Sequence, residues 1–327
     1  MWKLLKAIQQ NLTWSIPASM VLGLAFGYLL DAAFLKEAIV PLTFLMVYPM
    51  MVTLNMRQLF QGKDYKVQGG ALVINFLITP FIGYGLGRLF FPDQPLLALG
   101  ILLTSLLPTS GMTISWTGFA KGNMAAAVKM TIIGLIVGSL ATPLYLQGLM
   151  GTVVKVSIGE VFSQILFIVF LPLILGAATQ WLLLRYAGKE AFQNRYKPRF
   201  PLISTLGVLA IVFVSMALKA RSILEDPSVL LYYFLPLLAL YAINFLLSTL
   251  AGKYLFNRGE GIALVYGTVM RNLSIALAIA MGVFGKEGSE IALIISLAYI
   301  IQVQAAAWYV RLTPRIFGAP EEGQTPS

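Results

Sequence analysis

Residues 96–120 read LLALGILLTSLLPTSGMTISWTGFA, an apolar run long enough to cross a membrane but interrupted at its centre. Pro108 removes a backbone donor and clashes with the preceding turn, and Gly111 follows three residues later. In hydrocarbon, the freed backbone groups need partners or a cavity. The stretch therefore predicts a membrane helix that breaks at Pro108 and Gly111, with its broken ends facing a substrate. A simple kink that Ser and Thr side chains repair is the alternative.

Apolar runs of this length recur along the whole chain. Of the 327 residues, 58% are hydrophobic and 11% charged, whereas a soluble domain usually has about 25% charged residues. We therefore predict an all-α membrane protein with ten transmembrane helices. The predicted spans are 12–30, 38–54, 69–90, 96–120, 123–146, 161–184, 201–219, 229–256, 261–284 and 291–312.

The chain contains neither cysteine nor histidine. Their absence removes disulfides, thiolate chemistry and most zinc sites. Because no acidic residue lies well inside a predicted span either, acid–base and metal chemistry have few candidates. We expect neither an enzyme nor a cofactor, with sodium as the one ion left to consider.

Basic residues are distributed unevenly between the predicted loops. One side would carry Lys3, Lys6, Arg57, Lys63, Lys66, Lys121, Arg185, Lys189, Arg195, Lys197, Arg199, Lys253, Arg258, Arg311 and Arg315. The other would carry Lys36, Arg88, Lys155, Lys219, Arg221 and Lys286. The positive-inside rule then predicts a multi-pass protein of the cytoplasmic (inner) membrane with both termini in the cytoplasm. The net charge of +10 lies in short loops and indicates no nucleic-acid partner, and no obligate protein partner is indicated.

Short segments of the two halves resemble each other at a spacing of about 165 residues. Ile74-Asn75-Phe76-Leu77 recurs as Ile243-Asn244-Phe245-Leu246, for example. Because five spans is an odd number, two such repeats must lie inverted in the membrane, an arrangement typical of secondary transporters. We expect an interfacial helix at 1–11, repeats at 12–149 and 161–313 joined by a loop at 150–160, and a disordered cytoplasmic tail at 314–327.

Arg271 lies near the middle of an apolar span, ten residues from Gly261. A charge there costs about 2.5–3.5 kcal/mol, so it should face a cavity or a partner. A cavity that holds a cation and no acid favours an anion. We predict that a small anionic solute binds at residues from the break at Pro108, from the segment around Arg271 and from the recurring Ile-Asn-Phe-Leu segments: Arg271, Asn272, Thr109, Ser110, Thr113, Asn75 and Asn244. A structural Arg271 bonded to carbonyls is the alternative, as are simple interhelical hydrogen bonds for Asn75, Asn244 and Gln302.

Lys129 lies about two turns from the cytoplasmic end of its predicted span. We expect it to have no carboxylate partner inside the membrane, and either to compensate charge and carry a proton or to extend to the interface.

These features together resemble the bile acid:sodium symporter superfamily, which includes Acr3-type arsenite efflux carriers. The most specific segment is Pro108–Asn123 (PTSGMTISWTGFAKGN), which looks like the family's broken fourth helix, and Val47–Met51 (VYPMM) is similar to the arsenite branch. The resemblance implies a panel domain and a core domain in which the broken helices four and nine cross. It also implies alternating access by an elevator-like or rocking motion.

The chain departs from the family's sodium-site pattern. Asn75, Thr113 and Thr131 match polar positions, but Ile114 replaces an Asn, Gly267-Thr268 stands where a Glu is found, and Arg271 replaces a Gln. We expect coupling or charge-compensating roles for Lys129, Thr131, Thr268 and Gln302. We expect sodium coupling to be weak or absent.

The expected function is secondary active transport of a small organic anion through the lipid bilayer. A metalloid efflux permease for arsenite or antimonite is the alternative, although the cysteine of the arsenite branch is missing. A channel is a further alternative that saturable counterflow would exclude.

Overall fold

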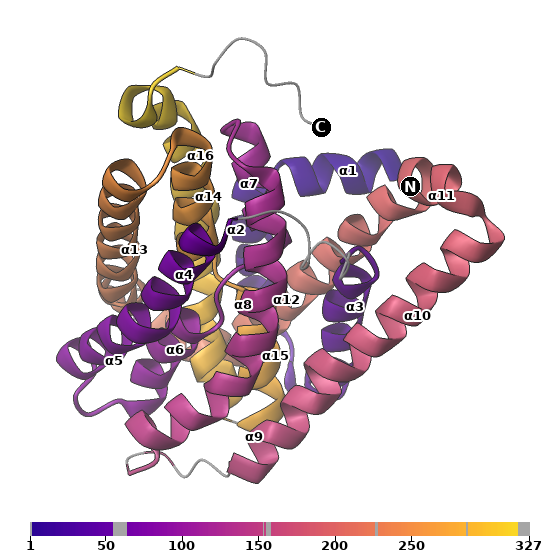
Figure 1. The fold of residues 1–327 in the computed structure, drawn as a ribbon. Helices are drawn as coiled ribbons and strands as arrows, with labels where there is room; N and C mark the ends of the chain where they lie inside the picture. Colours follow the sequence, from indigo (N-terminus) through magenta and orange to yellow (C-terminus); the bar gives the residue numbers. More distant parts are fainter. Residues whose placement is uncertain are drawn as a thin grey trace.

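The computed structural model describes residues 2–54, 64–152, 154, 158–225, 228–285 and 287–319 (Figure 1). Within these ranges every regular element is helical. Six helical runs are long and apolar enough to cross a membrane: Tyr65–Phe90, Met124–Met150, Gly159–Tyr186, Gly188–Arg221, Leu230–Leu255 and Gly288–Phe317. The pair α1 (Trp2–Gln10) and α2 (Leu12–Leu29), bent by 98°, adds a seventh only if the two helices are counted as one span. The chain is therefore a multi-pass helical membrane protein.

One group of helices packs around the long helix α12 (Phe200–Glu225), which contacts α1, α2 and α3 (Ile39–Val52). Helix α10 (Leu171–Tyr186) packs on α3 and forms the long edge of the molecule in Figure 1. The group is completed by α9 (Ile158–Ile165), which continues through a π-helical turn into α10, and by the short α11 (Gly188–Ala191).

Glycines allow close packing within this group. A Cβ on Gly27 of α2 would lie 2.0 Å from the Ala217 carbonyl oxygen of α12, and one on Gly207 would lie 2.6 Å from the Met46 backbone of α3. Because only hydrogen fits at these positions, the helix backbones can approach closely, as is common where small residues line membrane helix contacts.

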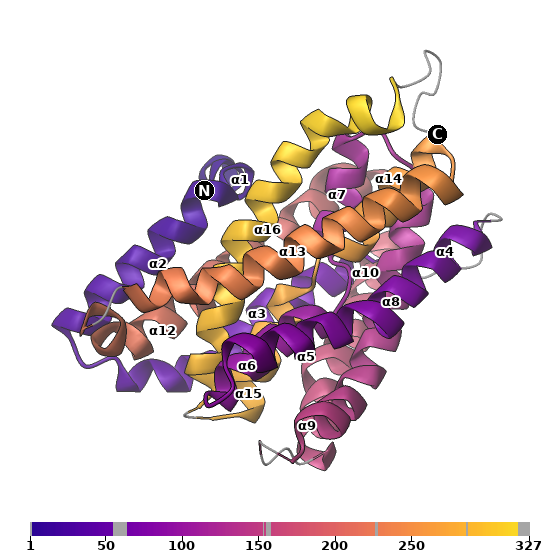
Figure 2. The ribbon, with the colours of Figure 1, turned by 90° about the vertical axis from the view of Figure 1, so that its left-hand side faces the viewer.

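The second group of helices contains both interrupted segments (Figure 2). Its elements are α4 (Tyr65–Leu72), α5 (Thr79–Phe90), α6 (Pro95–Leu106), α7 (Gly111–Phe119), α8 (Met124–Tyr145), α13 (Ser228–Leu255), α14 (Arg258–Val269), α15 (Leu273–Val283) and α16 (Gly288–Phe317). A π-helical turn, Val73–Ile78, joins α4 to α5. Helices α15 and α16 also contact the first group.

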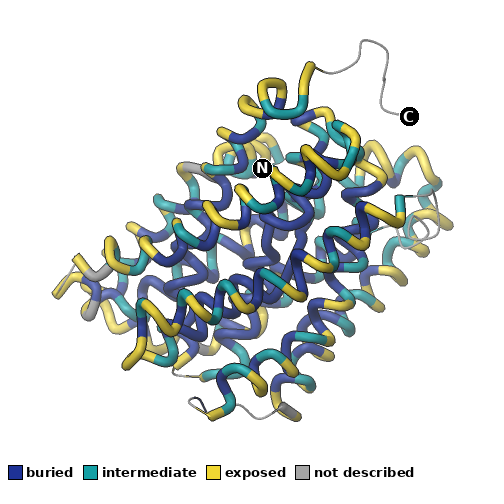
Figure 3. Tube along the Cα trace, turned by 60° about the vertical axis from the view of Figure 1, so that its left-hand side comes forward, coloured by how far each residue is buried: buried dark blue, intermediate teal, exposed yellow. Residues whose placement is uncertain are grey.

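Burial places one interrupted segment at the centre of the fold. Every residue from Gly261 to Met281 is buried, so α14 and α15 are surrounded by other helices (Figure 3). Large apolar side chains such as Leu29, Leu231 and Leu246 are instead exposed on the outside. An apolar exterior around a packed interior is what a lipid-facing protein presents.

The predicted spans coincide with described helices, with differences at their ends. Spans 96–120 and 261–284 each consist of two helices, and α12 continues six residues beyond position 219 to Glu225. The predicted tail 314–327 begins too early, because α16 continues through Pro314 to Phe317. Residues 320–327, and residues 153 and 155–157 of the predicted loop 150–160, lie outside the described residues.

Candidate anion site at the crossing of two broken helices

The two interrupted segments meet at their breaks. The Thr109 N–H donates to the Met270 carbonyl at 2.7 Å, and the Asn272 N–H donates to the Leu107 carbonyl at 2.7 Å. Pro108 and Arg271 thereby face each other as in a single antiparallel bridge. Backbone groups that the breaks release are thus paired across the crossing, as a membrane interior requires. The interruption at Pro108 is therefore a break and not a kink.

Several side chains predicted to bind substrate cap the N-termini of α7 and α15, the second helices of the two interrupted segments. Ser110 Oγ accepts the Met112 N–H at 3.2 Å, and Thr113 Oγ1 accepts the Ser110 N–H at 3.1 Å, which completes a capping box on α7. Asn272 Oδ1 likewise accepts from the Ile275 N–H at 3.3 Å at the start of α15. Both helix N-termini, which carry partial positive charge, therefore begin at the crossing.

Thr109 adopts a left-handed backbone conformation with φ of 63°. A β-branched residue is rarely found there and stays only where its surroundings hold it. The Thr109 hydroxyl donates to the Pro108 carbonyl at 2.6 Å and lies 3.3 Å from the Thr131 carbonyl of α8. Thr131 itself donates to the Ala127 carbonyl. Helix α8 thus supports the break through its backbone, while the Thr131 hydroxyl is bonded within its own helix.

Arg271 is the largest fully buried side chain of the described chain, with 1% of its surface exposed. None of its guanidinium nitrogens has a hydrogen-bond partner among the described residues. The alternative in which carbonyl groups accept hydrogen bonds from Arg271 is therefore wrong for the described residues. An arginine keeps its charge and has five N–H donors. The crossing therefore holds a buried cation whose N–H donors have no acceptor among the described residues.

Gln302 of α16 fixes the backbone of Arg271. Its Oε1 accepts the Arg271 N–H at 2.7 Å and its Nε2 donates to the Arg271 carbonyl at 3.2 Å. The Tyr241 hydroxyl of α13 donates to the same Oε1 at 2.8 Å. Gln302 therefore makes an interhelical contact with the backbone of the broken segment.

Asn75 and Asn244 contact carbonyl groups at the C-terminal end of α14. Asn75 Nδ2 donates to the Gly267 carbonyl at 2.9 Å, and Asn244 Nδ2 lies 3.4 Å from the Thr268 carbonyl. Asn244 Oδ1 accepts from Thr79, whereas buried Asn75 Oδ1 has no partner among the described residues. Thr268 donates to the Leu264 carbonyl at 2.8 Å. Consecutive carbonyls at the end of a half-helix are thus satisfied by two asparagines, one from each half of the chain.

Lys129 lies in a different cluster, and the expectation that it has no carboxylate partner is wrong. Its ammonium group pairs with Asp64, which precedes α4, and both side chains are almost buried. Gln68 also donates to Asp64, at 3.0 Å. Burial raises the pKa of the Asp64 carboxyl, but the hydrogen bonds it accepts from Lys129 and Gln68, a backbone hydrogen bond and the Lys129 charge together hold it below its ordinary value.

Two polar residues of α13 were not predicted: Tyr241, which orients Gln302, and Ser248, whose hydroxyl lies 2.6 Å from that of Thr268. Both are on α13 with Asn244, at helical spacings of three and four residues. That spacing could have identified them as one polar face directed into the bundle.

Among the described residues no group of three or more His, Cys, Asp or Glu side chains could hold a metal.

Comparison with known proteins gives a family match over most of the membrane region. The model of the Sodium Bile acid symporter family matches residues 40–226, more than half of the chain.

Among curated relatives, the "Arsenical-resistance protein Acr3" of Alkaliphilus metalliredigens is 24% identical, with 94% of this chain and 92% of that protein covered. The "Uncharacterized sodium-dependent transporter YocS" of Bacillus subtilis is 27% identical, with 64% and 63% covered. The "Sodium/bile acid cotransporter 7" of Danio rerio is 27% identical, with 59% and 57% covered.

Proposed function

Because the chain belongs to the Sodium Bile acid symporter family, a family of membrane transporters, we propose that it carries a small organic anion by secondary active transport. It would act in the cytoplasmic membrane by alternating access, with both termini in the cytoplasm. The observation that carries this proposal is the buried guanidinium of Arg271, which lacks a hydrogen-bond partner among the described residues. An anion that accepts from it would supply the charge and the bonds that the protein does not.

We propose that the chain has ten transmembrane spans, arranged as two inverted five-helix repeats. The first repeat would be 12–149 and the second 161–313. The panel domain would be the group around α12, and the core domain would contain α6–α7 and α14–α15. Two features support the inversion: each half has one broken helix, and Asn75 and Asn244 occupy matching positions beside the same helix end.

The hydrogen bonds that each residue makes support a separate role for it in the proposed site. Arg271 would bind the anionic group directly, and the N-termini of α7 and α15 would add partial positive charge. Ser110, Thr113 and Asn272 would position these N-termini, since their side chains already cap them. Gln302 would hold the Arg271 backbone in place.

A thermal-shift screen of the purified protein against small carboxylates, sulfonates and oxyanions tests the proposal. A ligand that binds only the folded state stabilises it by about 2.7 kcal/mol at a hundredfold excess over its Kd. We expect an anion to raise the Tm of the native protein and of Arg271→Lys, but not of Arg271→Gln. Exposed Arg88 provides the matched control Arg88→Gln, which should respond like the native protein. Equal stabilisation of Arg271→Gln would overturn the assignment.

Sodium coupling is proposed to be weak or absent. Arg271 places a permanent positive charge at the crossing, and the ion pairs found among the described residues, Lys129–Asp64 and Lys219–Glu290, do not include it. A nearby bound cation would be repelled. Transport in proteoliposomes should therefore be the same with sodium or choline as the external cation, and strongly sodium-dependent uptake would contradict this.

Export of arsenite or antimonite is the second candidate, because the relatives that match this chain over nearly their whole length include an arsenical-resistance protein. The absence of cysteine requires such export to proceed without thiolate ligands. Deletion of the gene distinguishes the candidates: increased sensitivity of the host to arsenite would favour metalloid export, and unchanged sensitivity would favour the organic anion.

A further inference from the structure

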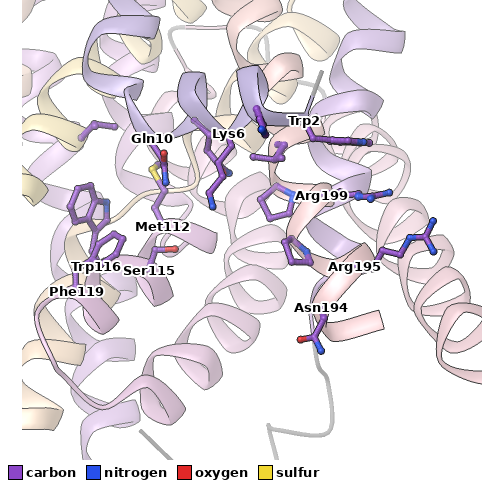
Figure 4. Close-up of a pocket in the computed structure, with 16 residues that line it drawn as sticks. Trp2, Lys6, Gln10, Met112, Ser115, Trp116, Phe119, Asn194, Arg195 and Arg199 are labelled. Atoms are coloured by element: carbon purple, nitrogen blue, oxygen red, sulfur yellow. The ribbon is translucent and has the colours of Figure 1, made fainter. Parts of the chain in front are cut away.

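A cavity of about 770 Å³ opens between α1, α7 and the segment that leads into α12 (Figure 4). Helix α1 runs across the top of the molecule between α7 and α11 and forms one wall of this cavity (Figure 1). We call this cavity the cationic vestibule, because its lining includes Lys3, Lys6, Arg195 and Arg199 and no acidic residue.

The charge of the cationic vestibule is not neutralised within the described chain. The ion pairs found among the described residues are Lys129–Asp64 and Lys219–Glu290, and neither involves a lining residue. Arg199 lies 5.0 Å from the ring centre of Trp2, which orients the guanidinium without cancelling its charge. A concave surface lined by one sign of charge focuses the field and concentrates counter-ions.

The lining also places the cationic vestibule beside the half-helix that starts at the crossing of the broken helices. Met112, Ser115, Trp116 and Phe119 line it at spacings of three and four residues, which is one face of α7. This face begins two residues after Ser110, the cap at the break. Val303 of α16, another lining residue, follows Gln302, which holds Arg271. The cavity therefore extends along the half-helix that starts at the crossing.

We infer that the cationic vestibule is a second anion-binding site, which collects small soluble anions on the cytoplasmic side before they reach Arg271. That the anion continues to Arg271 rests on the proposed function, whereas its binding in the cationic vestibule does not. Lysine, arginine and tryptophan at a membrane surface also suit an anionic lipid headgroup. The wall formed by α7, which leads inward to the break, favours the soluble anion.

Quenching of tryptophan fluorescence tests the inference without requiring a substrate. Trp116 is kept as the single tryptophan by the changes Trp2→Phe, Trp14→Phe, Trp181→Phe and Trp308→Phe. Iodide is the anionic quencher and acrylamide the neutral one, so the ratio of their quenching constants reports local anion concentration. The test variant is Lys6→Gln with Arg199→Gln. The matched control is Arg185→Gln with Lys189→Gln, two exposed cations outside the lining.

We expect the test variant to lower the iodide-to-acrylamide ratio by at least about twofold and the control to leave it unchanged. The ratio should be equal in nanodiscs of phosphatidylcholine with and without phosphatidylglycerol. An unchanged ratio in the test variant, or an equal fall in the control, would overturn the inference. Loss of the iodide excess on adding phosphatidylglycerol would assign the cavity to a lipid headgroup instead. Because quenching needs neither transport nor Arg271, this test and the thermal-shift test can fail independently.

Discussion

Lys129 and Arg271 both carry a positive charge inside the helical bundle, but their surroundings differ. Lys129 pairs with Asp64, whereas the Arg271 guanidinium has no partner among the described residues. A buried pair that loses one member leaves an uncompensated charge. Lys129 is thus structurally compensated, while the donors of Arg271 are not used by any described residue. The coupling role predicted for Lys129 would require the pair with Asp64 to open.

Asp64→Asn should destabilise the protein at neutral pH by about 3 kcal/mol, because Lys129 loses its counter-charge. The folded-state pKa of Asp64 lies below its ordinary value of 3.8. The stabilisation should therefore be complete above the unfolded-state pKa and be lost as the pH falls through the folded-state pKa. Thermal unfolding in detergent at a series of pH values measures the difference between the native protein and Asp64→Asn.

Glu290→Gln provides the control, because the Lys219–Glu290 pair, at 3.2 Å, is partly exposed. Its loss should change stability by less than about 1 kcal/mol. Equal effects of the two variants, or an Asp64→Asn difference that does not shrink at low pH, would contradict this account of the Lys129 pair.

At the scale of helices, the break at Pro108 could be predicted because proline and glycine interrupt an apolar run. The break at Arg271 was indicated by its charge and by the family resemblance, which implies a broken ninth helix. The pairing of Lys129 with Asp64 could not be predicted, because Asp64 lies 65 residues away in a segment interpreted as a loop. Ser110 and Asn272 were predicted as ligands, but their role as helix caps depends on where the new helices start.

Gly134 of α8 lies against the break and should not accept a side chain. A Cβ there would lie 2.4 Å from Thr109 Oγ1 and 3.3 Å from the Pro108 carbonyl oxygen. Because Thr109 is already held at φ of 63°, it has little freedom to move. Gly134→Ala should lower the Tm and abolish anion stabilisation.

Gly148, in the π-helical turn that ends the same helical run, has no atom within 4 Å of an added Cβ. Gly148→Ala should leave the Tm unchanged or raise it, because alanine is favoured over glycine in helices by roughly 0.5–1 kcal/mol. If both alanine variants behaved alike, α8 would not support the break in the way described.

At the scale of the whole molecule, the distribution of basic residues gives an orientation that the helices alone do not. Absence of native cysteine makes single-cysteine labelling unambiguous. Gln10, Arg315 and Asp93 are exposed at α1, α16 and the turn between α5 and α6. The charge bias predicts that the first two lie in the cytoplasm and the third outside.

Right-side-out vesicles with Gln10→Cys, Arg315→Cys or Asp93→Cys should therefore react differently with an impermeant maleimide. Only Asp93→Cys should be labelled before the vesicles are opened, and all three afterwards. Labelling of Gln10→Cys and Arg315→Cys from opposite sides would contradict an even number of spans and hence two inverted five-helix repeats.

Counterflow in proteoliposomes tests most directly whether an anion bound at Arg271 is carried across the membrane. The probe is the radiolabelled form of the anion that gives the largest thermal shift, with the unlabelled anion inside. We predict saturable counterflow for the native protein, reduced counterflow for Arg271→Lys, and none for Arg271→Gln, with Arg88→Gln unaffected. Counterflow of equal rate in Arg271→Gln would contradict the central claim, because the buried guanidinium would then have no part in binding the transported anion.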